Sequence, residues 1–595
     1  MEHLEGYNTY VLGAIGALTL GLFYILLRSD PEAPVPYNVT PPEQSQPGWK
    51  GEVLEEPSLK VSGSSLVQCY APATGESLGR INPSSTSSID RAIAKATEAQ
   101  TQWAQTTFSQ RRKVLKTMLK FVLENQEAIA RVACLDSGKT MVDACLGEIL
   151  VTVEKLRWVI KHGEESLKSE RRPGNMLMAY KWHEVMWQPL GVVAACVSWN
   201  YPFHNLISPI IASIFAGNAI IVKGSENTAW SSSYFTSIAT SALVACGHNP
   251  NIVQSVICWP NVAEHLTSHP SIAHITFIGS RPVAHHVCAS ASKALTPVCV
   301  ELGGKDPAIV LDDLSKSDFK RVSGILMRGV FQSAGQNCIG IERVIALPKV
   351  YSRFIDHFAP LITALRPGSI LNHSPDDEQI DIGACISDAN FFKLEAIIQD
   401  AVSNGARLIC GGKRYIHPKY PKGHYFTPTL IVDVKPTMKI AQTELFAPVF
   451  LLMRAENIDD AIAIANSTPY ALGASVYGSS TRSLERVVRE VHAGMVAVND
   501  FAVTYVVQLP FGGIKGSGYG RFAGKEGMRS LCNQKAVTRD RWPGLIKTSI
   551  PGPMDLPLKG RGAGEKAWKM AVGIVWFGYG DWRGKIKGIK GLIGL

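Results

Sequence analysis

Short runs of β-branched and other apolar residues alternate with helix-length segments through most of this chain, and this alternation constrains the fold more than any other feature. The first runs read GVVAACVSW, NAIIVKG, HITFIGS, VCVELGG and PAIVLDD, starting at Gly191, Asn218, His274, Val298 and Pro307. Between the first two, FHNLISPIIASIFAG is apolar on all sides, which predicts a buried helix. Alternating strands and helices predict an α/β fold with parallel sheets and ligands at the carboxyl ends of the strands.

A second series of apolar runs begins at Glu342 and reads ERVIALP, FTPTLIVDV, PVFLLM, ALGASVYG and MVAVND. The two series together predict two parallel-sheet α/β domains that face each other across a cleft. The length of 595 residues is sufficient for two large cores. A hydrophobic content of 46% with 18% charged residues excludes a chain that is disordered or coiled-coil as a whole.

The net charge of +10 is concentrated at the C-terminal end, because residues 541–595 hold ten basic and three acidic side chains. The rest of the chain is nearly neutral, which argues against a nucleic-acid partner, since phosphate binding needs a basic face on the folded domain. The twelve cysteines are scattered singly without a C-x-x-C pair. We therefore expect a reducing compartment and no disulfide framework or metal site.

Residues 10–27 contain no charge, and at about 1.5 Å per residue they are just long enough to cross a bilayer core. A cleavable signal peptide is the alternative, but Glu2 and Glu5 precede the run and no small-residue cleavage site follows it. Residues 1–28 are therefore predicted to be an uncleaved transmembrane anchor. Acidic residues before the run and Arg28 after it favour a body in the cytosol.

The segments next to the two ends also look membrane-directed. Residues 29–58 are rich in proline and lack apolar periodicity, which is typical of a semi-rigid linker. The tail 541–595 interleaves tryptophans with lysines, as expected of a segment that lies in a membrane interface, and its apolar run is too short to span. A free basic tail, which its many glycines would allow, is the equal alternative.

Three side chains from separate strand ends and turns carry the candidate chemistry. Cys338 ends the turn FQSAGQNC, and a cysteine there is a possible nucleophile, although a single cysteine is more often a small buried apolar residue. Glu301 leaves a strand into the Gly-Gly turn of ELGGK, whose glycines permit close backbone approach. Asn200 of SWNYP follows another strand, so its amide can point to the same strand-end region.

In order and type, these strings resemble the aldehyde dehydrogenase superfamily from about Leu59 to Val537, together with CYAPATGESLGRI, KGSE, FIGS, ELFAP and PFGGIKGSGYGR. The resemblance implies that Cys338 is the nucleophile, Glu301 the general base and Asn200 an oxyanion donor. A thiolate that attacks an aldehyde carbonyl creates an oxyanion, which the Asn200 amide and the Cys338 N–H would stabilise. Hydride transfer to a nicotinamide leaves a thioester, which a water activated by Glu301 hydrolyses.

The resemblance also implies an NAD site without the usual G-x-G-x-x-G fingerprint. Lys223 and Glu226 would lie at the adenosine ribose, and Gly279 and Ser280 would lie at the pyrophosphate, where a helix starts. Glu444 would hold the nicotinamide ribose, Phe446 would pack nearby, and Trp199 would line the same cleft. Glu226 would accept hydrogen bonds from a free ribose 2′-hydroxyl and repel a 2′-phosphate, which favours NAD. Lys223 beside it keeps NADP possible.

Several cofactor strings depart from the common pattern of the family. Gly224 replaces a proline, Ile278 a threonine, and Ala284 and Ala447 replace glycines. Alanine reaches positive φ less readily than glycine, so a lower cofactor affinity is expected. With the longer string GRFAGKEG and the N-terminal helix, the chain most resembles the fungal, membrane-anchored aldehyde dehydrogenase-like proteins named for meiotic sister-chromatid recombination.

Four parts are predicted between the anchor and the tail, and the last three follow from the resemblance. They are the linker 29–58, a dinucleotide-binding domain formed by 59–170 and 190–305, a bridging β element formed by 171–189 and 525–540, and a catalytic domain at 306–524. The bridging element builds dimers in such proteins, so a homodimer or higher homo-oligomer is expected.

The expected substrate is a small-molecule aldehyde, and the membrane-directed ends favour a long-chain or otherwise apolar one. Aromatic residues next to the matched strings could line its entrance, at Tyr201, Phe203, Phe331, Phe501, Tyr505 and Phe511. The expected location is a membrane, the endoplasmic reticulum, with the catalytic body in the cytosol.

Three other functional classes remain open. A CoA-acylating dehydrogenase usually lacks the general-base glutamate, so Glu301 counts against it. A cysteine hydrolase needs a histidine partner for Cys338, and no matched string contains one. The main alternative is a catalytically weak or inactive membrane interaction protein that keeps the aldehyde dehydrogenase fold.

Overall fold

The computed structural model describes residues 30–369, 379–501 and 506–593. The chain divides into two compact units, which are treated separately below. The larger unit comprises Met1–Ser166 and Pro189–Leu531, and the smaller one comprises Leu167–Gln188 and Cys532–Leu595. The finer division into a dinucleotide-binding and a catalytic domain stays a prediction.

A six-stranded sheet in the larger unit carries the strand ends on which the candidate residues lie. Its order is β19-β9-β8-β5-β6-β7, with five parallel strands and an antiparallel edge strand, β19. The strands are β5 (Val192–Cys196), β6 (Ala219–Lys223), β7 (Val253–Val256), β8 (Ile275–Ile278), β9 (Val298–Glu301) and β19 (Gly518–Tyr519). Strands β5 and β8 are buried along their whole length, as continuous apolar runs in a parallel sheet require.

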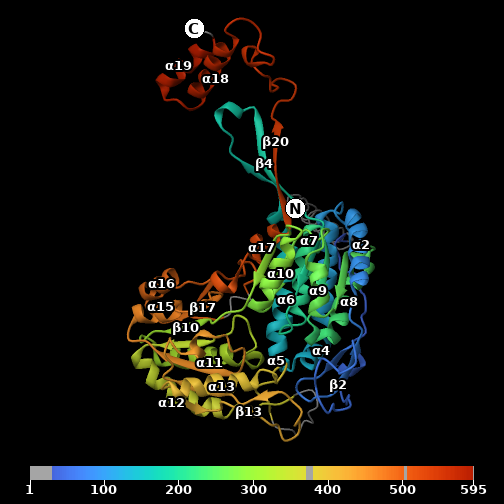
Figure 1. Cartoon of the computed structure of the whole chain (residues 1–595), viewed down its shortest axis with the longest axis vertical. Helices are drawn as coiled ribbons and strands as arrows, with labels where there is room; N and C mark the ends of the chain where they lie inside the picture. The colour runs from blue at the N-terminus through green and yellow to red at the C-terminus, as the bar shows by residue number, and fades with distance from the viewer. Residues whose placement is uncertain (1–29, 370–378, 502–505, 594–595) are drawn as a thin grey trace, which may run out of the picture. The chain divides into compact units, whose positions relative to one another are not determined.

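Helices cover this sheet (Figure 1). Helix α7 (His204–Ala216) has ten buried residues out of thirteen, which confirms the helix buried on all sides that its sequence predicts. The other helices of this region are α2 (Thr86–Trp103), α3 (Phe108–Glu124), α4 (Gln126–Ser137), α5 (Met141–Ala144), α6 (Val151–Leu167), α8 (Ala229–Ala245), α9 (Pro260–Thr267), α10 (Arg281–Ser292) and α17 (Gly524–Ser530). A small hairpin is formed by β1 (Val67–Tyr70) and β2 (Ser77–Ile81).

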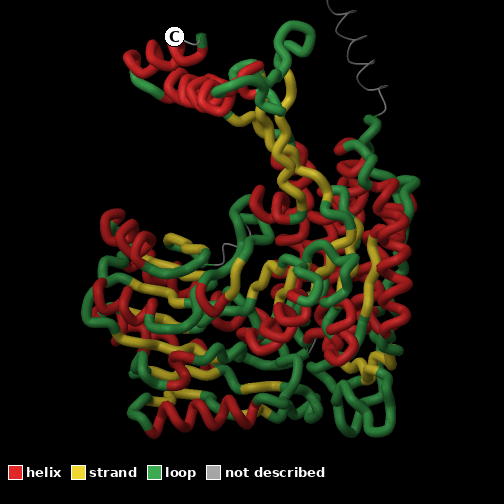
Figure 2. Tube along the Cα trace, turned by 45° about the horizontal axis from the view of Figure 1, so that its top comes forward, coloured by secondary structure: helices red, strands yellow, loops and turns green. Residues whose placement is uncertain are grey.

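A seven-stranded sheet forms the second layered part of the larger unit, and in Figure 2 its strands lie between helices. Its order is β12-β15-β16-β11-β10-β17-β18, and only β12 is antiparallel to its neighbour. The strands are β10 (Pro307–Val310), β11 (Arg343–Ala346), β12 (Arg407–Cys410), β15 (Thr429–Val432), β16 (Val449–Arg454), β17 (Gly473–Tyr477) and β18 (Met495–Val498). The prediction of two parallel-sheet α/β layers is thereby confirmed.

Helices on the seven-stranded sheet enclose a continuous apolar core. They are α11 (Lys316–Phe331), α12 (Pro348–Thr363), α13 (Phe391–Ser403), α14 (Lys439–Gln442), α15 (Ile458–Asn466) and α16 (Thr481–Glu490), and the two-residue strands β13 (Arg414–Tyr415) and β14 (Tyr425–Phe426) pair beside them. Strand order departs from sequence order in two places. Strand β10 continues the first series of runs but joins this sheet, whereas β19 returns to the six-stranded sheet beside β9. Spatial neighbours of this kind cannot be read from the order of the runs.

The smaller unit contains a three-stranded sheet and a helical hairpin. The sheet order is β20-β4-β3, formed by β3 (Glu170–Arg172), β4 (Lys181–Pro189) and β20 (Cys532–Asp540). The hairpin is formed by α18 (Ala563–Tyr579) and α19 (Trp582–Leu592). Its helices approach closely at glycines, since a Cβ on Gly588 would lie 2.3 Å from the backbone nitrogen of Phe577. Glycine is needed there to let the two backbones touch.

Among the described residues, no helix combines the length and the apolar composition that crossing a bilayer requires. The predicted transmembrane helix at residues 10–27 lies outside the described residues, so it stays a prediction.

Candidate active site

The turn that carries Cys338 has an unusual backbone that fixes the position of the thiol. After α11 ends at Phe331, Ser333, Ala334 and Gly335 all have positive φ, at 54°, 57° and 73°. A Cβ on Gly335 would lie 2.2 Å from the carbonyl oxygen of Ala447, so only glycine fits there. The turn holds Cys338 half-buried.

Glu301 occupies the carboxyl end of β9, as the sequence predicts, and only 2% of its surface is exposed. Its Oε1 accepts a hydrogen bond of 3.1 Å from the N–H of Gly303. Burial raises the pKa of the Glu301 carboxyl to about 7, although the hydrogen bonds from Gly303 and from the Cys338 thiol lower it. Such a carboxyl exchanges protons near neutral pH, as a general base must.

Cys338 and Glu301 line the same cavity, so the thiol and the carboxyl face a shared space. Burial raises the pKa of the Cys338 thiol well above its usual value, and the negative charge of Glu301 adds to this effect. The thiol is therefore protonated at rest. The Glu301 carboxylate is the group in this cavity that can accept the proton of the Cys338 thiol.

Asn200 does not line that cavity, but it is tied to the turn that carries the thiol. Its Nδ2 donates a hydrogen bond of 3.2 Å to the carbonyl of Gln336, two residues before Cys338. Its Oδ1 accepts hydrogen bonds from Ser198 and Asn205, so the orientation of the amide is fixed. An amide NH2 has a second hydrogen, and the predicted oxyanion role of Asn200 stays a prediction.

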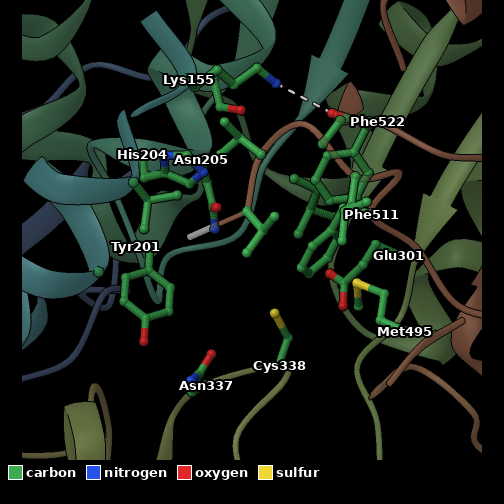
Figure 3. A pocket seen from close by; sticks show the side chains of 18 of the residues that line it. Lys155, Tyr201, His204, Asn205, Glu301, Asn337, Cys338, Met495, Phe511 and Phe522 are labelled. Carbon is green, nitrogen blue, oxygen red and sulfur yellow. Dashed lines mark hydrogen bonds between the residues drawn. The ribbon is translucent and has the colours of Figure 1, made fainter. Parts of the chain in front are cut away.

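The cavity extends from Cys338 between apolar walls to a more polar end (Figure 3). Apolar side chains of its wall include Met495, Val507, Leu509, Phe511 and Phe522. Polar ones gather on α6 and α7 and comprise Lys155, His204, Asn205 and Ser208. Of the aromatic residues predicted to line an entrance, Tyr201 and Phe511 line this cavity, and Tyr505 lies outside the described residues. Phe203, Phe331 and Phe501 are buried but are not among the lining residues.

A second cleft, of about 670 Å³, adjoins the first through Ile278, which lines both. Five residues predicted for dinucleotide binding line it, namely Trp199, Lys223, Glu226, Gly279 and Ser280. The Lys223 ammonium and the Glu226 carboxylate form an ion pair at 2.9 Å. Ser280 is the N-cap of the twelve-residue helix α10, whose positive end faces an anion placed there. In size and donor set the cleft fits a dinucleotide.

Glu444 and Phe446 do not line the second cleft, although Phe446 contacts Trp199, which does. The Phe446 ring meets the Trp199 ring edge to face, with centroids 5.6 Å apart. The Glu444 carboxylate accepts a hydrogen bond of 3.1 Å from the N–H of Gly304 in the ELGGK turn. Burial raises the pKa of Glu444 well above its usual value.

The alanine replacements do not strain the backbone as the sequence suggests. Neither Ala284 nor Ala447 has a positive φ, whereas Phe446 does, at 53°. Ala284 lies buried inside the first turn of α10. The expectation of a lower cofactor affinity therefore has no backbone cause at these two alanines and stays a prediction, and of the replaced residues Ile278 lines both clefts.

Sequence reasoning missed two buried ion pairs that support the site. Lys305, within ELGGK, pairs with Glu342 at 2.7 Å, and the Glu342 carboxylate also accepts the N–H groups of Leu445 and Phe446. Lys139 pairs with Glu148 at 2.5 Å and donates to the carbonyl of Asn200 at 2.8 Å. The signal for Lys305 was its place inside a matched motif, whereas nothing in the sequence marked Lys139.

Comparisons with known proteins identify the family of this chain. The model of the aldehyde dehydrogenase family matches residues 60–537. A proposed aldehyde dehydrogenase-like protein of Saccharomyces cerevisiae is 48% identical over 553 residues, 91% of this chain and 84% of the relative. Another, from Schizosaccharomyces pombe, is 50% identical over 519 residues, 87% of this chain and 97% of the relative.

Solved structures of similar proteins cover the same part of the chain. The crystal structure of a Mycobacterium tuberculosis aldehyde dehydrogenase complexed with NAD+ superposes with a TM-score of 0.73 at 28% identity, over 80% of this chain and 95% of that one. An Escherichia coli NADP-dependent enzyme superposes with a TM-score of 0.74 at 29% identity, over the same shares of 80% and 95%.

Proposed function

Because the chain belongs to the aldehyde dehydrogenase family, we propose that it oxidises an aldehyde to the carboxylate, with Cys338 as nucleophile and Glu301 as general base. The observation that carries the proposal is the cavity that the Cys338 thiol shares with the buried Glu301 carboxyl, whose pKa is about 7. The neighbouring cleft with its helix start supports a dinucleotide partner.

The reaction follows from the chemistry of these side chains. The Cys338 sulfur attacks the aldehyde carbon as the thiol proton passes to the Glu301 carboxylate and from there to solvent, and the Asn200 amide with the Cys338 N–H stabilises the oxygen of the adduct. The neighbouring cleft would hold a dinucleotide, which would supply the hydride acceptor, so that a thioester on Cys338 would result. Glu301 then takes a proton from a water molecule, whose oxygen attacks the thioester and releases the carboxylate and the thiol.

NAD is the proposed cofactor, and NADP is the alternative. The Glu226 carboxylate lies beside Lys223 in the cleft, where it can accept hydrogen bonds from a free ribose hydroxyl and repels a phosphate. The ion pair occupies Lys223, which reduces its attraction for a 2′-phosphate. Metal ions have no part in the proposed reaction.

The test is the formation of NADH by the purified full chain with a panel of aldehydes. We expect aldehyde-dependent NADH from the wild type and none above background from Cys338→Ser, because a hydroxyl is a far weaker nucleophile. Glu301→Gln should give a single burst of about one NADH per site and then stop, since the thioester is no longer hydrolysed. The same weak signal from all three proteins would favour the alternative, an inactive membrane interaction protein.

We also propose that residues 10–27 anchor the protein in a membrane, the endoplasmic reticulum, with the catalytic body in the cytosol. The uncharged run and the exposed aromatic residues of the C-terminal hairpin support this. Cytosolic orientation predicts no mobility shift after glycosidase treatment, because the sequons at Asn38, Asn372 and Asn466 would not be glycosylated. A shift would place the body in a lumen.

A homodimer or higher homo-oligomer is proposed as the assembly. The sheet β20-β4-β3 ends in strands with free edges, which a second copy can extend. Light scattering on the detergent-solubilised chain should give at least twice the mass of 64.6 kDa.

A further inference from the structure

One charged side chain in the cavity beside Cys338 has no part in the proposed reaction. Lys155, on α6, is only 6% exposed and lines the cavity. Its ammonium donates one long hydrogen bond, of 3.3 Å, to the carbonyl of Phe522. Within the described part of the chain no carboxylate lies within 4.0 Å of it. In Figure 3, Lys155 and Cys338 lie on opposite sides of the cavity.

A buried ammonium without a counter-ion is costly for the fold. The penalty for burying an unpaired charge is several kcal/mol even after relaxation of the surroundings. The other buried lysines near the site avoid it, because Lys139 pairs with Glu148 and Lys305 with Glu342. Lys155 is therefore the exception, and an anion bound in the cavity would supply the missing charge.

The neighbours of Lys155 provide polarity but no negative charge. His204 lies on α7, and its Nδ1 is 2.9 Å from the Thr152 hydroxyl. Burial, with the charges of Lys155 and Lys139, lowers the pKa of His204 to about 3, so its ring is neutral. Asn205 donates to Ser198 and to Asn200. This part of the cavity therefore favours an anion over a second cation.

We propose that Lys155 binds an acidic group at the far end of the aldehyde, so that the substrate is a short aldehyde bearing a carboxylate or a phosphate. This inference rests on the proposed function, because it assigns a substrate class to the same cavity. The apolar walls would contact the carbon chain between the two ends. A long apolar aldehyde, which the membrane-directed ends favour, would leave the ammonium buried without a partner.

The first experiment compares matched pairs of aldehydes with the purified full chain and NAD. The pairs are 4-oxobutanoate with butanal, 5-oxopentanoate with pentanal, and glyceraldehyde 3-phosphate with glyceraldehyde. A site with a buried charged group strongly rejects a substrate analogue that lacks the group with which it would pair. In at least one pair we therefore expect kcat/KM to be at least tenfold higher for the acidic aldehyde than for the neutral one. The pair that shows it distinguishes carboxylate from phosphate. Ratios below ten for all three pairs would overturn the inference.

Variants on one helix provide the second test. Lys155→Met should reduce the acidic-to-neutral ratio to about one, mainly through a higher KM for the acid, and Lys155→Arg should retain part of the preference. Lys161→Met removes an exposed lysine from the same helix and should leave the ratio unchanged. An unchanged ratio in Lys155→Met would contradict the inference.

The pH dependence of the wild type tests the inference even if Lys155→Met does not fold. Burial lowers the pKa of Lys155 to about 8, so the ammonium is lost above that pH. The other titratable groups that line the cavity are His204 on α7, Glu301 on β9, Cys338 and Tyr201, and burial raises the pKa of the Tyr201 hydroxyl above its usual value. They act on acidic and neutral aldehydes alike, so the acidic-to-neutral ratio should fall from pH 7 to pH 9.5. A constant ratio over this range would overturn the proposal.

Failure of this inference is distinguishable from failure of the proposed function. Neutral aldehydes that are oxidised as well as acidic ones would refute the role of Lys155 and leave the dehydrogenase intact. The absence of NADH with every aldehyde would refute both.

Discussion

At the scale of single residues, burial determines how the thiol and the carboxyl behave. Removing both groups from water raises the pKa of Glu301 to about 7 and that of Cys338 well above its usual value, because the charged form of each loses hydration. The hydrogen bond from the N–H of Gly303 partly offsets this for Glu301. At neutral pH the thiol therefore keeps its proton, whereas the Glu301 carboxyl is partly ionised.

The titration of Glu301 predicts a pH profile. Only its ionised form can activate water, so steady-state kcat limited by thioester hydrolysis should rise about tenfold per pH unit below pH 7 and level off above it. Glu301→Gln should abolish this limb, and Glu165→Gln, an exposed glutamate, should keep it. Steady-state rates from pH 5 to 9 measure the profile. An inflection near pH 4.5 would show that the carboxyl behaves as if it were in water.

At the scale of elements, three turns hold the site together. The ELGGK turn after β9 and the ELFAP turn before β16 share the buried pair of Lys305 and Glu342, whose carboxylate accepts the N–H groups of Leu445 and Phe446. The turn with Cys338 packs against the same segment, because Gly335 lies directly against Ala447. A change in one turn should therefore move the others.

This coupling predicts the effect of Gly335→Ala. A methyl group there would lie 2.2 Å from the Ala447 carbonyl and would require a φ of 73°, so the turn must shift and Cys338 with it. We expect kcat/KM to fall at least a hundredfold, since misplacement of a reacting group by about 1 Å costs that much.

Gly247→Ala is the matched control. Its φ of 79° is similar, but nothing lies within 4 Å of an added Cβ. It should lower the free energy of unfolding by about 1 kcal/mol without changing kcat/KM. Equal kcat/KM for the two variants would show that the contact of position 335 with Ala447 does not hold Cys338 in place.

At the scale of the whole molecule, the two clefts and the exposed aromatic hairpin belong to different units. All residues that line the two clefts lie in the larger unit, between Gly147 and Ala523. The helical hairpin of the smaller unit exposes large apolar side chains beside basic ones, with Trp568, Tyr579 and Trp582 each more than 60% exposed. This combination is typical of a surface that binds an anionic bilayer interface.

Replacement of four basic residues of the hairpin by glutamine should separate the two properties. We expect Arg583, Lys585, Lys587 and Lys590→Gln together to weaken binding to vesicles with anionic lipids at least tenfold, because each basic residue contributes about 1 kcal/mol near such a surface. Activity on soluble aldehydes should stay unchanged. Vesicle flotation and NADH assays measure the two effects.

The control removes four exposed lysines of the larger unit, Lys161, Lys349, Lys413 and Lys435, and so changes the net charge equally. It should keep vesicle binding. If both sets weaken binding alike, net charge and not the hairpin is responsible.

The sequence by itself determined the α/β class, the family and the main chemical groups. Each can be recognised from short strings of residues, because the residue types in them reflect the local backbone conformation. The Gly-Gly turn after Glu301 and the turn before Cys338 are such strings, and five of the seven predicted dinucleotide residues line one cleft. The domain division, the membrane helix at 10–27 and the oxyanion role of Asn200 stay predictions.

Only the tertiary structure decided which distant groups meet and which charges lack a partner. Strand β10 lies in the seven-stranded sheet and β19 in the six-stranded sheet. These positions depend on long-range strand pairing, which local sequence patterns do not encode. Lys155, Lys139 and Glu148 read as ordinary surface charges along the chain, yet all three are buried. Burial depends on the chain that covers a residue from elsewhere, and it makes Lys139 a support of Asn200 and leaves Lys155 as an unpaired cation in the cavity.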